Sequence, residues 1–312
     1  MQYFFVISFV ALLAAYETSA LSGVVSIHGS TTQVFSLSSP QHVQNVNFGF
    51  PASIDGQAVT FRGKGYLLGG YVSSVTKPTA TVTMFDPSTN KTQPVHPMMT
   101  SRRGHGATVI GNTSIVVCGG WHCKYYPDQG GWFCERTESC EQFDGTTWSP
   151  LPSFPGKNAQ IQMVTLNGKP HVIGGDKRDM HICALVINFV LDGGVWKQLA
   201  PVPAQMGGHS AIELDNDRAL VCGGSLGEAC LYGQTHCYIY TASTNHWAAT
   251  HSMNRPRSGF KMVKYQGRIT TIGGMDGGHD SSQVEVFDER TGWTLLPGPY
   301  PSSGAGGQVF AV

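Results

Sequence analysis

The sequence predicts an all-β fold built from five similar segments, and two observations support this. A Gly-Gly doublet recurs about every 50 residues, each time closing a short apolar run: Gly69-Gly70, Gly119-Gly120, Gly174-Gly175, Gly223-Gly224 and Gly273-Gly274. Between the doublets lie short alternating runs separated by turn residues, without a helical period. A period of this length is typical of repeat folds, in which each unit buries its faces against its neighbours.

The fifth segment shows the predicted unit most clearly. Four short strands are expected, at Ser258 to Tyr265, Arg268 to Gly274, Gln283 to Asp288 and Trp293 to Leu296. Turn residues such as Gln266-Gly267 separate them, and a polar loop joins the second strand to the third. The other segments align with this one, so each is predicted to form a four-stranded sheet.

Large aromatic residues recur at two fixed positions after the doublets. One position holds Trp148, Trp196, Trp247 and Trp293, and the other holds Phe85, Phe143, Tyr240 and Phe287. Because aromatic side chains bury a large area, these are predicted to pack between neighbouring sheets. The third segment diverges most, and the first has Thr92-Gln93-Pro94 in place of the Trp.

The doublet, the polar loop and the aromatic residue before a Trp together resemble the kelch repeat, over about residues 24–312. The resemblance implies a β-propeller with four-stranded blades. Residues 24–50 match strands 2 to 4 of a blade and residues 303–312 match strand 1. We therefore expect a six-bladed kelch β-propeller, with blades 1–5 in about 51–302 and blade 6 closed by the N- and C-terminal strands. Such closure protects an open sheet edge; five blades with loose ends is the alternative.

The charge balance of the chain and its N-terminal residues indicate where in or outside the cell the protein is found. The 312 residues include 20 basic and 20 acidic side chains without a basic cluster, which argues against a nucleic-acid or anionic-membrane surface. Residues 1–20 form an apolar run followed by small residues, as in a signal peptide cut near Ala20, although no Lys or Arg precedes the run. We expect a secreted monomer with no membrane insertion after cleavage; a membrane anchor is the alternative.

Eight cysteines in a secreted chain predict disulfides. Two of them directly precede a doublet and three, Cys140, Cys183 and Cys237, begin the following strand, which suggests cross-strand bridges. The suggested pairs are Cys118–Cys140 and Cys222–Cys237, with Cys123–Cys134 closing one long loop and Cys183 with Cys230 as the remaining pair. The pairing stays open at this point, since eight cysteines allow about 105 connectivities. Asn90 and Asn112 begin glycosylation sequons in two predicted hairpin turns.

The resemblance also implies where a ligand binds. In kelch propellers the loops between strands 2 and 3 and the segments that join blades surround one mouth of the central channel. The candidate ligand-binding residues there are Arg103, His105, Tyr125, Tyr126, Arg178, His209, Arg257, Asp276 and His279. Arg103 and Arg257 match a recurrent Arg before strand 1 that suits carboxylate or planar polar groups. The alternative is that such Arg side chains only bind loop carbonyls.

The loop after the second doublet is the longest of its kind and is rich in aromatic residues. With Cys123–Cys134 closing it, it resembles a rigid recognition finger, because Tyr and Trp anchor many interfaces. The alternative is a loop that packs its aromatic side chains onto its own blade.

These features favour a non-catalytic, secreted kelch propeller that binds an extracellular protein or glycan and needs no cofactor or metal. One alternative is a sugar-acting enzyme, similar to a mutarotase or epimerase, that pairs Glu228 with Arg103 or Arg257 in the channel. A structural component of extracellular matrix or mucus is another. Fold resemblance alone does not choose among them.

Overall fold

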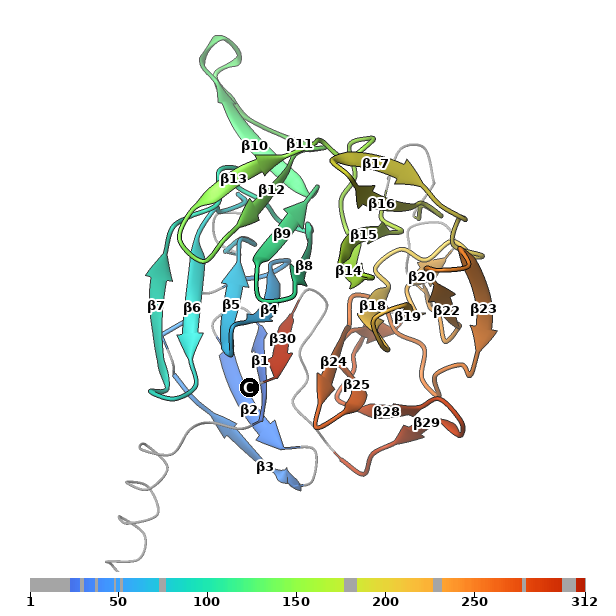
Figure 1. Ribbon diagram of the computed structural model, residues 1–312. Coiled ribbons are helices and arrows are strands. Elements are labelled where there is room, and N and C mark those ends of the chain that lie inside the picture. Colours follow the sequence, from blue (N-terminus) through green and yellow to red (C-terminus); the bar gives the residue numbers. More distant parts are fainter. Residues whose placement is uncertain are drawn as a thin grey trace, which may run out of the picture.

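The computed structural model describes residues 23–28, 31–36, 39–47, 49–50, 53–72, 77–176, 184–226, 232–276, 279–298 and 307–311. These residues form six four-stranded antiparallel sheets, arranged around a central axis as the blades of a propeller (Figure 1). The expected number of blades and of strands in each is confirmed. Within the described residues, no helix is long and apolar enough to cross a membrane.

Blades 1 to 3 follow one another along the chain. Blade 1 consists of β4 (Gln57–Phe61), β5 (Lys64–Leu68), β6 (Val82–Asp86) and β7 (Lys91–Val95). Blade 2 consists of β8 (Gly106–Ile110), β9 (Ser114–Cys118), β12 (Cys140–Phe143) and β13 (Trp148–Leu151). Blade 3 consists of β14 (Gln162–Leu166), β15 (Lys169–Ile173), β16 (Asn188–Asp192) and β17 (Val195–Gln198).

Blades 4 and 5 repeat the pattern, and blade 6 combines both ends of the chain. Blade 4 consists of β18 (Ser210–Glu213), β19 (Arg218–Cys222), β22 (Cys237–Thr241) and β23 (His246–Thr250). Blade 5 consists of β24 (Lys261–Tyr265), β25 (Arg268–Ile272), β28 (Glu285–Asp288) and β29 (Gly292–Leu295). Blade 6 consists of β30 (Gln308–Ala311), β1 (Val24–His28), β2 (Thr31–Ser36) and β3 (Ser39–Asn45).

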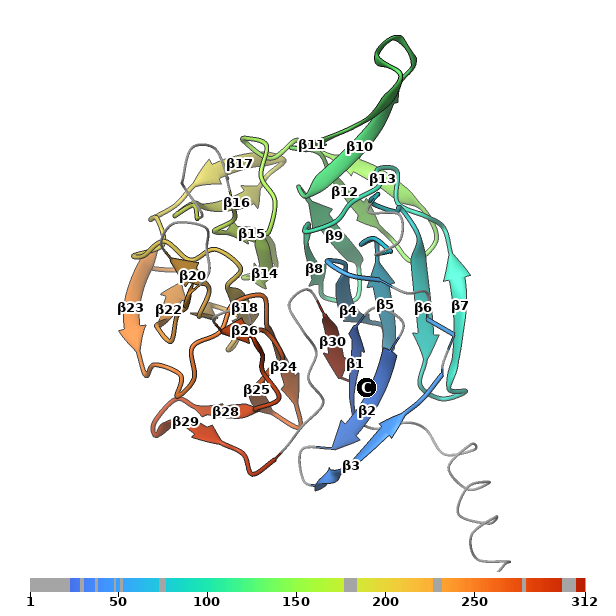
Figure 2. The same cartoon turned by 180° about the vertical axis from the view of Figure 1, so that it is seen from behind.

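The innermost strands of the blades form a ring. β4, β8, β14, β18, β24 and β30 each contact the next in this order, and β30 contacts β4. β30 also pairs with β1, from Val24 opposite Ala311 to Ile27 opposite Gln308, and the two strands lie side by side in both ribbon views (Figure 2). The two ends of the described chain therefore meet in one sheet.

The doublet glycines connect neighbouring blades. All ten of them have positive φ, for example 66° at Gly119 and 93° at Gly120, a region that other residues rarely adopt. The backbone N–H of Gly120 donates to the carbonyl of Asn158, 2.8 Å away in the segment that leads into blade 3. A Cβ on Gly120 would lie 2.8 Å from the carbonyl oxygen of Arg103. The doublet glycines thus permit a positive φ and also let the segment that leads into the next blade come close to the backbone.

The recurrent Trp residues bridge blades, as predicted. Each indole N–H donates to a carbonyl in the segment that follows the preceding blade: Trp148 to His96, Trp196 to Pro152, Trp247 to Ala200 and Trp293 to His251, at 2.9–3.0 Å. The apolar core lies between adjacent sheets, as where Phe61 and Leu68 of blade 1 meet Ile115 of blade 2. The repeat is therefore the unit of both packing and hydrogen bonding.

Three of the suggested disulfide pairings are confirmed. Cys118–Cys140 and Cys222–Cys237 join directly opposite residues of strands 2 and 3 within blades 2 and 4. Cys123–Cys134 closes a separate hairpin. Cys183, Cys230 and residues 1–20 lie outside the described residues. The two sequons begin in strand-connecting turns, Asn90 between β6 and β7 and Asn112 between β8 and β9.

Candidate binding surface: a projecting hairpin and the central channel

The longest connection between strands 2 and 3 forms a two-stranded hairpin that projects from blade 2 (Figure 1). Its strands are β10 (Trp121–Tyr126) and β11 (Gly131–Arg136), joined at the tip by the short 3-10 helix η1 (Pro127–Gln129). The corresponding connections in blades 4 and 5 form much shorter ribbons: β20 (Ser225–Leu226) with β21 (Tyr232–Gly233), and β26 (Met275–Asp276) with β27 (His279–Asp280).

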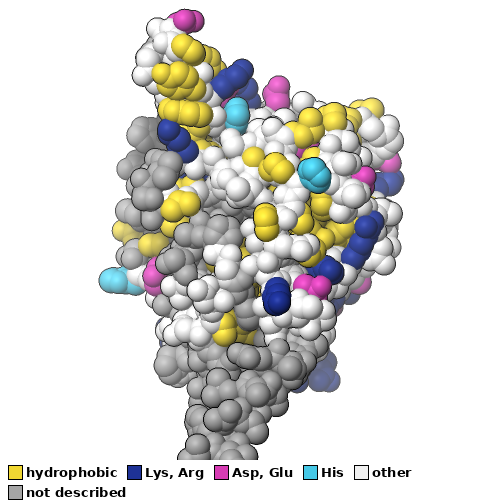
Figure 3. Space-filling view, turned by 90° about the vertical axis from the view of Figure 1, so that its left-hand side faces the viewer, with side chains coloured by type: hydrophobic (Ala, Val, Ile, Leu, Met, Phe, Trp, Pro, Cys, Tyr) yellow, Lys and Arg dark blue, Asp and Glu magenta, His cyan; other side chains and the backbone are white. Residues whose placement is uncertain are grey.

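Four aromatic side chains of the hairpin are exposed to solvent. The exposed fractions are 50% for Tyr125, 36% for Tyr126, 50% for Trp132 and 48% for Phe133. In the space-filling view, hydrophobic side chains gather on the projection at the top of the molecule (Figure 3). The recognition-finger interpretation therefore fits the structure, and the alternative, in which these side chains pack onto their own blade, is wrong.

The four rings form two pairs on opposite faces of the ribbon. Tyr125 lies directly opposite Trp132, with ring centroids 5.5 Å apart. Tyr126 and Phe133 are diagonal neighbours, with centroids 5.8 Å apart. Because side chains alternate across a strand, the second pair faces away from the first. Both faces of the tip are therefore apolar.

Covalent and polar contacts hold the hairpin. Cys123 and Cys134 are opposite one another in the ladder and are disulfide-bonded. Lys77 of the connection in blade 1 places Nζ 4.2 Å from the centroid of the Trp132 ring, a cation–π contact. Near the base, Lys157 Nζ lies 2.7 Å from Glu135 Oε2, and this hydrogen bond lowers the pKa of Glu135. The hairpin is thus closed by a disulfide and contacted by side chains from two other segments of the chain.

The position of the recurrent Arg requires a correction. The sequence comparison matched Arg103 with Arg257, but the structure matches Arg102 with Arg257. The carbonyl of Arg102 accepts from the second doublet glycine of the preceding blade, and so does that of Arg257. Both guanidinium groups are fully buried and pair with a buried carboxylate, Glu141 or Glu285. Arg257 is therefore structural, and the predicted ligand contact is wrong for it.

Arg103, in contrast, does not form a buried ion pair and lies partly exposed near the mouth of the channel. Its side chain is 28% exposed, with Nη1 4.0 Å from Oδ2 of Asp55. Its guanidinium carbon lies 4.8 Å from the centroid of the Tyr71 ring. Arg103 is thus a partly exposed cation stacked on an aromatic ring, and it remains a candidate for ligand contact.

His105 and His209 occupy equivalent buried positions, with at most 1% exposure. The ring nitrogens of His209 lie 2.6 Å from the Met206 carbonyl oxygen and 3.1 Å from that of Ile173. Burial lowers the pKa of His209 to about 4 and that of His105 well below its usual range. Neither imidazole is accessible to a ligand, so the prediction that His105 and His209 bind one is wrong.

The remaining candidates divide between exposed and undescribed positions. Asp276 and His279 face each other across the β26–β27 ribbon and both are exposed. Arg178 and Glu228 lie outside the described residues. The enzyme alternative pairs Glu228 with Arg103 or Arg257, and the burial of Arg257 removes one of these two pairings.

The central channel contains charged residues that the sequence analysis missed. A cavity of about 510 Å³ is lined by the innermost strands, and Lys261 of β24 and Glu213 of β18 both line it. Lys261 Nζ donates to Oε1 of Gln57, 3.0 Å away across the channel. The sequence did contain a sign of a channel site. Lys261 is charged, although alignment of the repeats places its strand at the centre of the ring.

Comparisons with known proteins agree with this architecture. No protein-family model matches the chain. Over 95 residues, 30% of its length, it is 30% identical to proteins named Kelch-like protein 24 from Homo sapiens, Rattus norvegicus and Mus musculus, of which it covers 15%. A solved structure titled "Structure of YjhT" superimposes with a TM-score of 0.69, covering 90% of this chain and 97% of that one, at 15% identity.

The chain folds as a six-bladed β-propeller, and part of it is similar to kelch-like proteins. In this propeller the doublet glycines and the recurrent Trp residues connect the blades, and two sites remain to be explained. One is the aromatic hairpin of blade 2 and the other is the charged channel.

Proposed function

We propose that this kelch propeller is a secreted, non-catalytic binding protein that inserts its β10–β11 hairpin into a groove of an extracellular protein. The observation that carries the proposal is the exposure of four aromatic rings on a projecting, disulfide-closed element. Exposed apolar surface of this kind is costly in water and marks interaction sites. Aromatic side chains also supply much of the binding free energy at interfaces.

The exposed area suits the centre of an interface. At about 200 Å² per ring, the exposed fractions of these four side chains correspond to roughly 300–400 Å². A stable protein complex buries about 800 Å² on each partner, so the hairpin would supply nearly half of one side. Neighbouring rim residues such as Arg103 and Tyr71 would supply more.

The arrangement of the rings favours a protein groove over a sugar. A sugar stacks on one ring face at a time, whereas here Tyr125 and Trp132 lie on one face of the ribbon and Tyr126 on the other. A partner that covers both faces has to surround the tip. A concave protein surface does this, which is why we commit to a protein partner.

The charges around the hairpin indicate the character of that groove. Its own charged side chains and the two lysines that contact it comprise four basic and two acidic residues: Lys77, Lys124, Arg136, Lys157, Asp128 and Glu135. The excess of positive charge complements an acidic rim. Such complementarity speeds association more than it tightens binding, so the association rate should fall with added salt.

The disulfides support an extracellular location, because disulfides persist in oxidising compartments. To test it, the full chain is expressed in cultured secretory cells, and the medium is assayed after thiols are blocked without reduction. Oxidised protein in the medium is expected. Reduced protein retained in the cytosol would contradict this part of the proposal.

The binding test compares three proteins against an array of purified extracellular domains. These are the wild type, the double variant Tyr125→Ala with Trp132→Ala, and the control Tyr232→Ala, which removes another exposed ring away from the hairpin. We expect at least one partner whose affinity falls at least 30-fold in the double variant, about 2 kcal/mol. The control should bind as the wild type does.

Other outcomes point elsewhere. Partners that bind the double variant as tightly as the wild type would exclude the hairpin as the anchor. Binding on a glycan array that the double variant loses would replace the protein partner by a sugar. Catalytic turnover of a small metabolite by the purified chain would contradict the non-catalytic assignment.

A further inference from the structure

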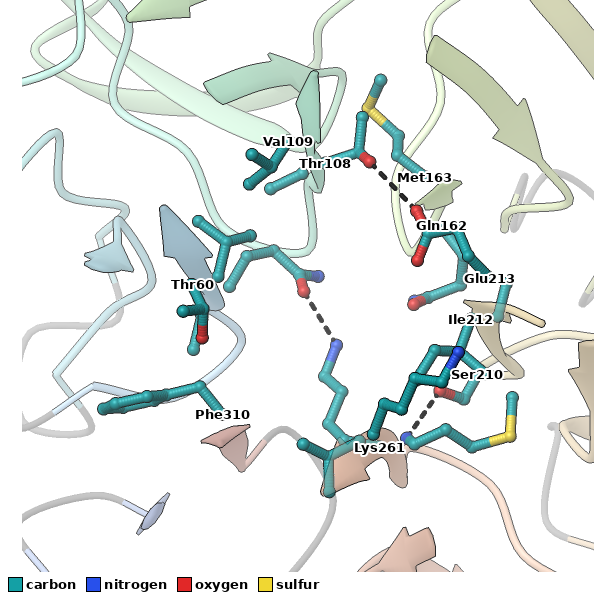
Figure 4. Close-up of a pocket in the computed structure, with 18 of the residues that line it drawn as sticks. Thr60, Thr108, Val109, Gln162, Met163, Ser210, Ile212, Glu213, Lys261 and Phe310 are labelled. Carbon is teal, nitrogen blue, oxygen red and sulfur yellow. Dashed lines mark hydrogen bonds between the residues drawn. The ribbon is translucent and has the colours of Figure 1, made fainter. Parts of the chain in front are cut away.

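The central channel has the size and polarity of a small-molecule site. Its volume of about 510 Å³ falls in the range of known ligand pockets. Hydrogen-bonding side chains line it alongside apolar ones, among them Gln57, Thr108, Gln162 and Thr165. In the close-up, Lys261 and Glu213 enter the same space from neighbouring blades (Figure 4).

Lys261 is an exception among equivalent positions. It is the first residue of its innermost strand, and the first residues of the other five are neutral: Gln57, Gly106, Gln162, Ser210 and Gln308. The ring therefore packs at this level without a charge in five of six blades. A lysine here has no role that the repeat requires.

The contacts of Lys261 leave its charge available. Its hydrogen bond goes to the neutral amide oxygen of Gln57. Asp55 attracts the ammonium at longer range, and the same carboxylate lies 4.0 Å from the guanidinium of Arg103. Two cations thus share one carboxylate at this end of the channel. A partly desolvated ammonium with a neutral partner reduces stability unless an anion joins it.

Glu213 marks the other polar end. Its Oε1 accepts from the backbone N–H of Thr165 at 2.7 Å, and the hydroxyl of Thr108 lies 3.5 Å away. The hydroxyls of Thr108 and Thr165 are 2.9 Å apart. Among the described residues, the hydrogen bonds of Glu213 involve Oε1, so its second carboxylate oxygen can accept from a ligand hydroxyl. Neutral hydroxyls and a carboxylate acceptor are what a polyhydroxylated molecule needs.

We propose that the channel binds a small hydroxycarboxylate, with its carboxylate against the Lys261 ammonium and its hydroxyls toward Thr108 and Glu213. The charge of the ligand neutralises the excess at one end, and its hydroxyls replace water at the other. The site is separate from the aromatic hairpin. This proposal therefore does not rest on the protein partner proposed above.

The test uses three probes that separate the two recognition elements. Gluconate carries both a carboxylate and hydroxyls, sorbitol carries only hydroxyls, and hexanoate carries only a carboxylate. Each is titrated into the purified chain by calorimetry and by ligand-observed NMR. Gluconate should bind at least tenfold more tightly than sorbitol and than hexanoate, because a charged hydrogen bond contributes about 1.5–3 kcal/mol.

Variants then assign the residues. Lys261→Met should weaken gluconate at least tenfold, and Glu213→Gln, which keeps an acceptor for Thr165, should weaken it about threefold or more. Lys197→Met serves as control, because Lys197 is an exposed lysine on the outer strand of blade 3 that pairs with Asp192. It should bind as the wild type does. Thermal unfolding of each variant verifies that it is folded.

Several results would overturn the proposal. They are the absence of gluconate binding at 50 mM, equal binding of hexanoate and gluconate, and unchanged gluconate affinity in folded Lys261→Met. The hairpin variant Tyr125→Ala with Trp132→Ala should bind gluconate normally. A loss of gluconate binding in that variant would contradict the independence of the two sites.

Discussion

Arg102 and Glu141 form an ion pair that water does not reach. Nη2 of the guanidinium lies 3.0 Å from Oε1 of the carboxylate, and the two side chains are 0% and 2% exposed. The same guanidinium donates to the carbonyls of Gly119 and Ser139. Glu141 also accepts the backbone N–H of Met99, at 2.6 Å. This one buried ion pair thus connects the doublet glycine Gly119, strand 3 of blade 2 and the segment that joins blades 1 and 2.

Removing one member of this pair should destabilise the propeller strongly. Arg102→Met leaves the Glu141 carboxylate buried without its cation, which costs about 3–5 kcal/mol. Adding Glu141→Leu should recover part of that loss, because no unpaired charge remains. Urea-induced unfolding measures both. Arg218→Met removes solvent-exposed ion pairs with Asp215 and Glu289 and should cost about 1 kcal/mol or less. Equal losses for Arg102→Met and Arg218→Met would contradict the role of the buried pair.

A doublet glycine should tolerate substitution far less than a glycine in a turn. Gly274 has φ of 86°, and a Cβ there would lie 2.7 Å from Cβ of Phe260 and 2.9 Å from the carbonyl oxygen of Ser258. Gly267 has φ of 75°, with nothing within 4 Å of its Cβ position. Both alanine variants incur left-handed strain of about 1–2 kcal/mol, but only Gly274→Ala adds a steric clash. Thermal unfolding should show a clearly larger loss for Gly274→Ala, and similar losses would refute the close-approach argument.

Lys261 should reduce stability at neutral pH. Burial lowers its pKa from 10.5 to about 8, so the folded state loses this proton at lower pH than the unfolded chain does. Between about pH 8 and 10.5 the unfolded state binds more protons, and the stability contributed by this group rises with pH. Lys261→Met should therefore be more stable than the wild type at pH 7, with a difference that shrinks by pH 10. Denaturant unfolding of both proteins at the two pH values measures it; a constant difference would be the contrary result.

The hairpin disulfide should be separable from the disulfides of the blades. Cys134 is exposed, whereas Cys118 and Cys140 are buried in blade 2. Mild reduction followed by alkylation should modify Cys134 first, as identified by mass spectrometry. Replacing Cys123 and Cys134 by Ser should weaken partner binding with little effect on global unfolding. Replacing Cys118 and Cys140 by Ala should cost about 2–4 kcal/mol. Preferential alkylation of Cys118 would contradict this order.

Much of the architecture could be predicted because it depends on local conformational and packing requirements that recur in each repeat. A doublet that needs both positive φ and close approach of another backbone favours glycine, and a Trp that reaches the preceding blade's exit segment recurs at one offset. Both are therefore visible as periodic residues. The three disulfide pairs could be suggested because antiparallel neighbours place strand-end cysteines opposite one another. The exposed aromatic hairpin could be suggested from its composition, but not its direction.

The site was harder to predict because it depends on register and on what neighbours leave exposed. A shift of one residue separates Arg102, which is buried against Glu141, from Arg103, which reaches the rim beside Tyr71. Sequence alignment did not detect that shift, since both positions hold Arg. His105 and His209 were expected at a ligand site, yet the packing of adjacent blades buries them.

By itself the sequence determined the repeat, the strands within it and the residues that join one blade to the next, because these depend on φ, turn chemistry and local apolar pattern. Only the tertiary structure decided which side chains meet across the ring, because Lys261 and Gln57 are 204 residues apart and become neighbours when the sheets close around the channel. It also decided that the four rings of the hairpin stay exposed, since the described parts of the blades do not bury them.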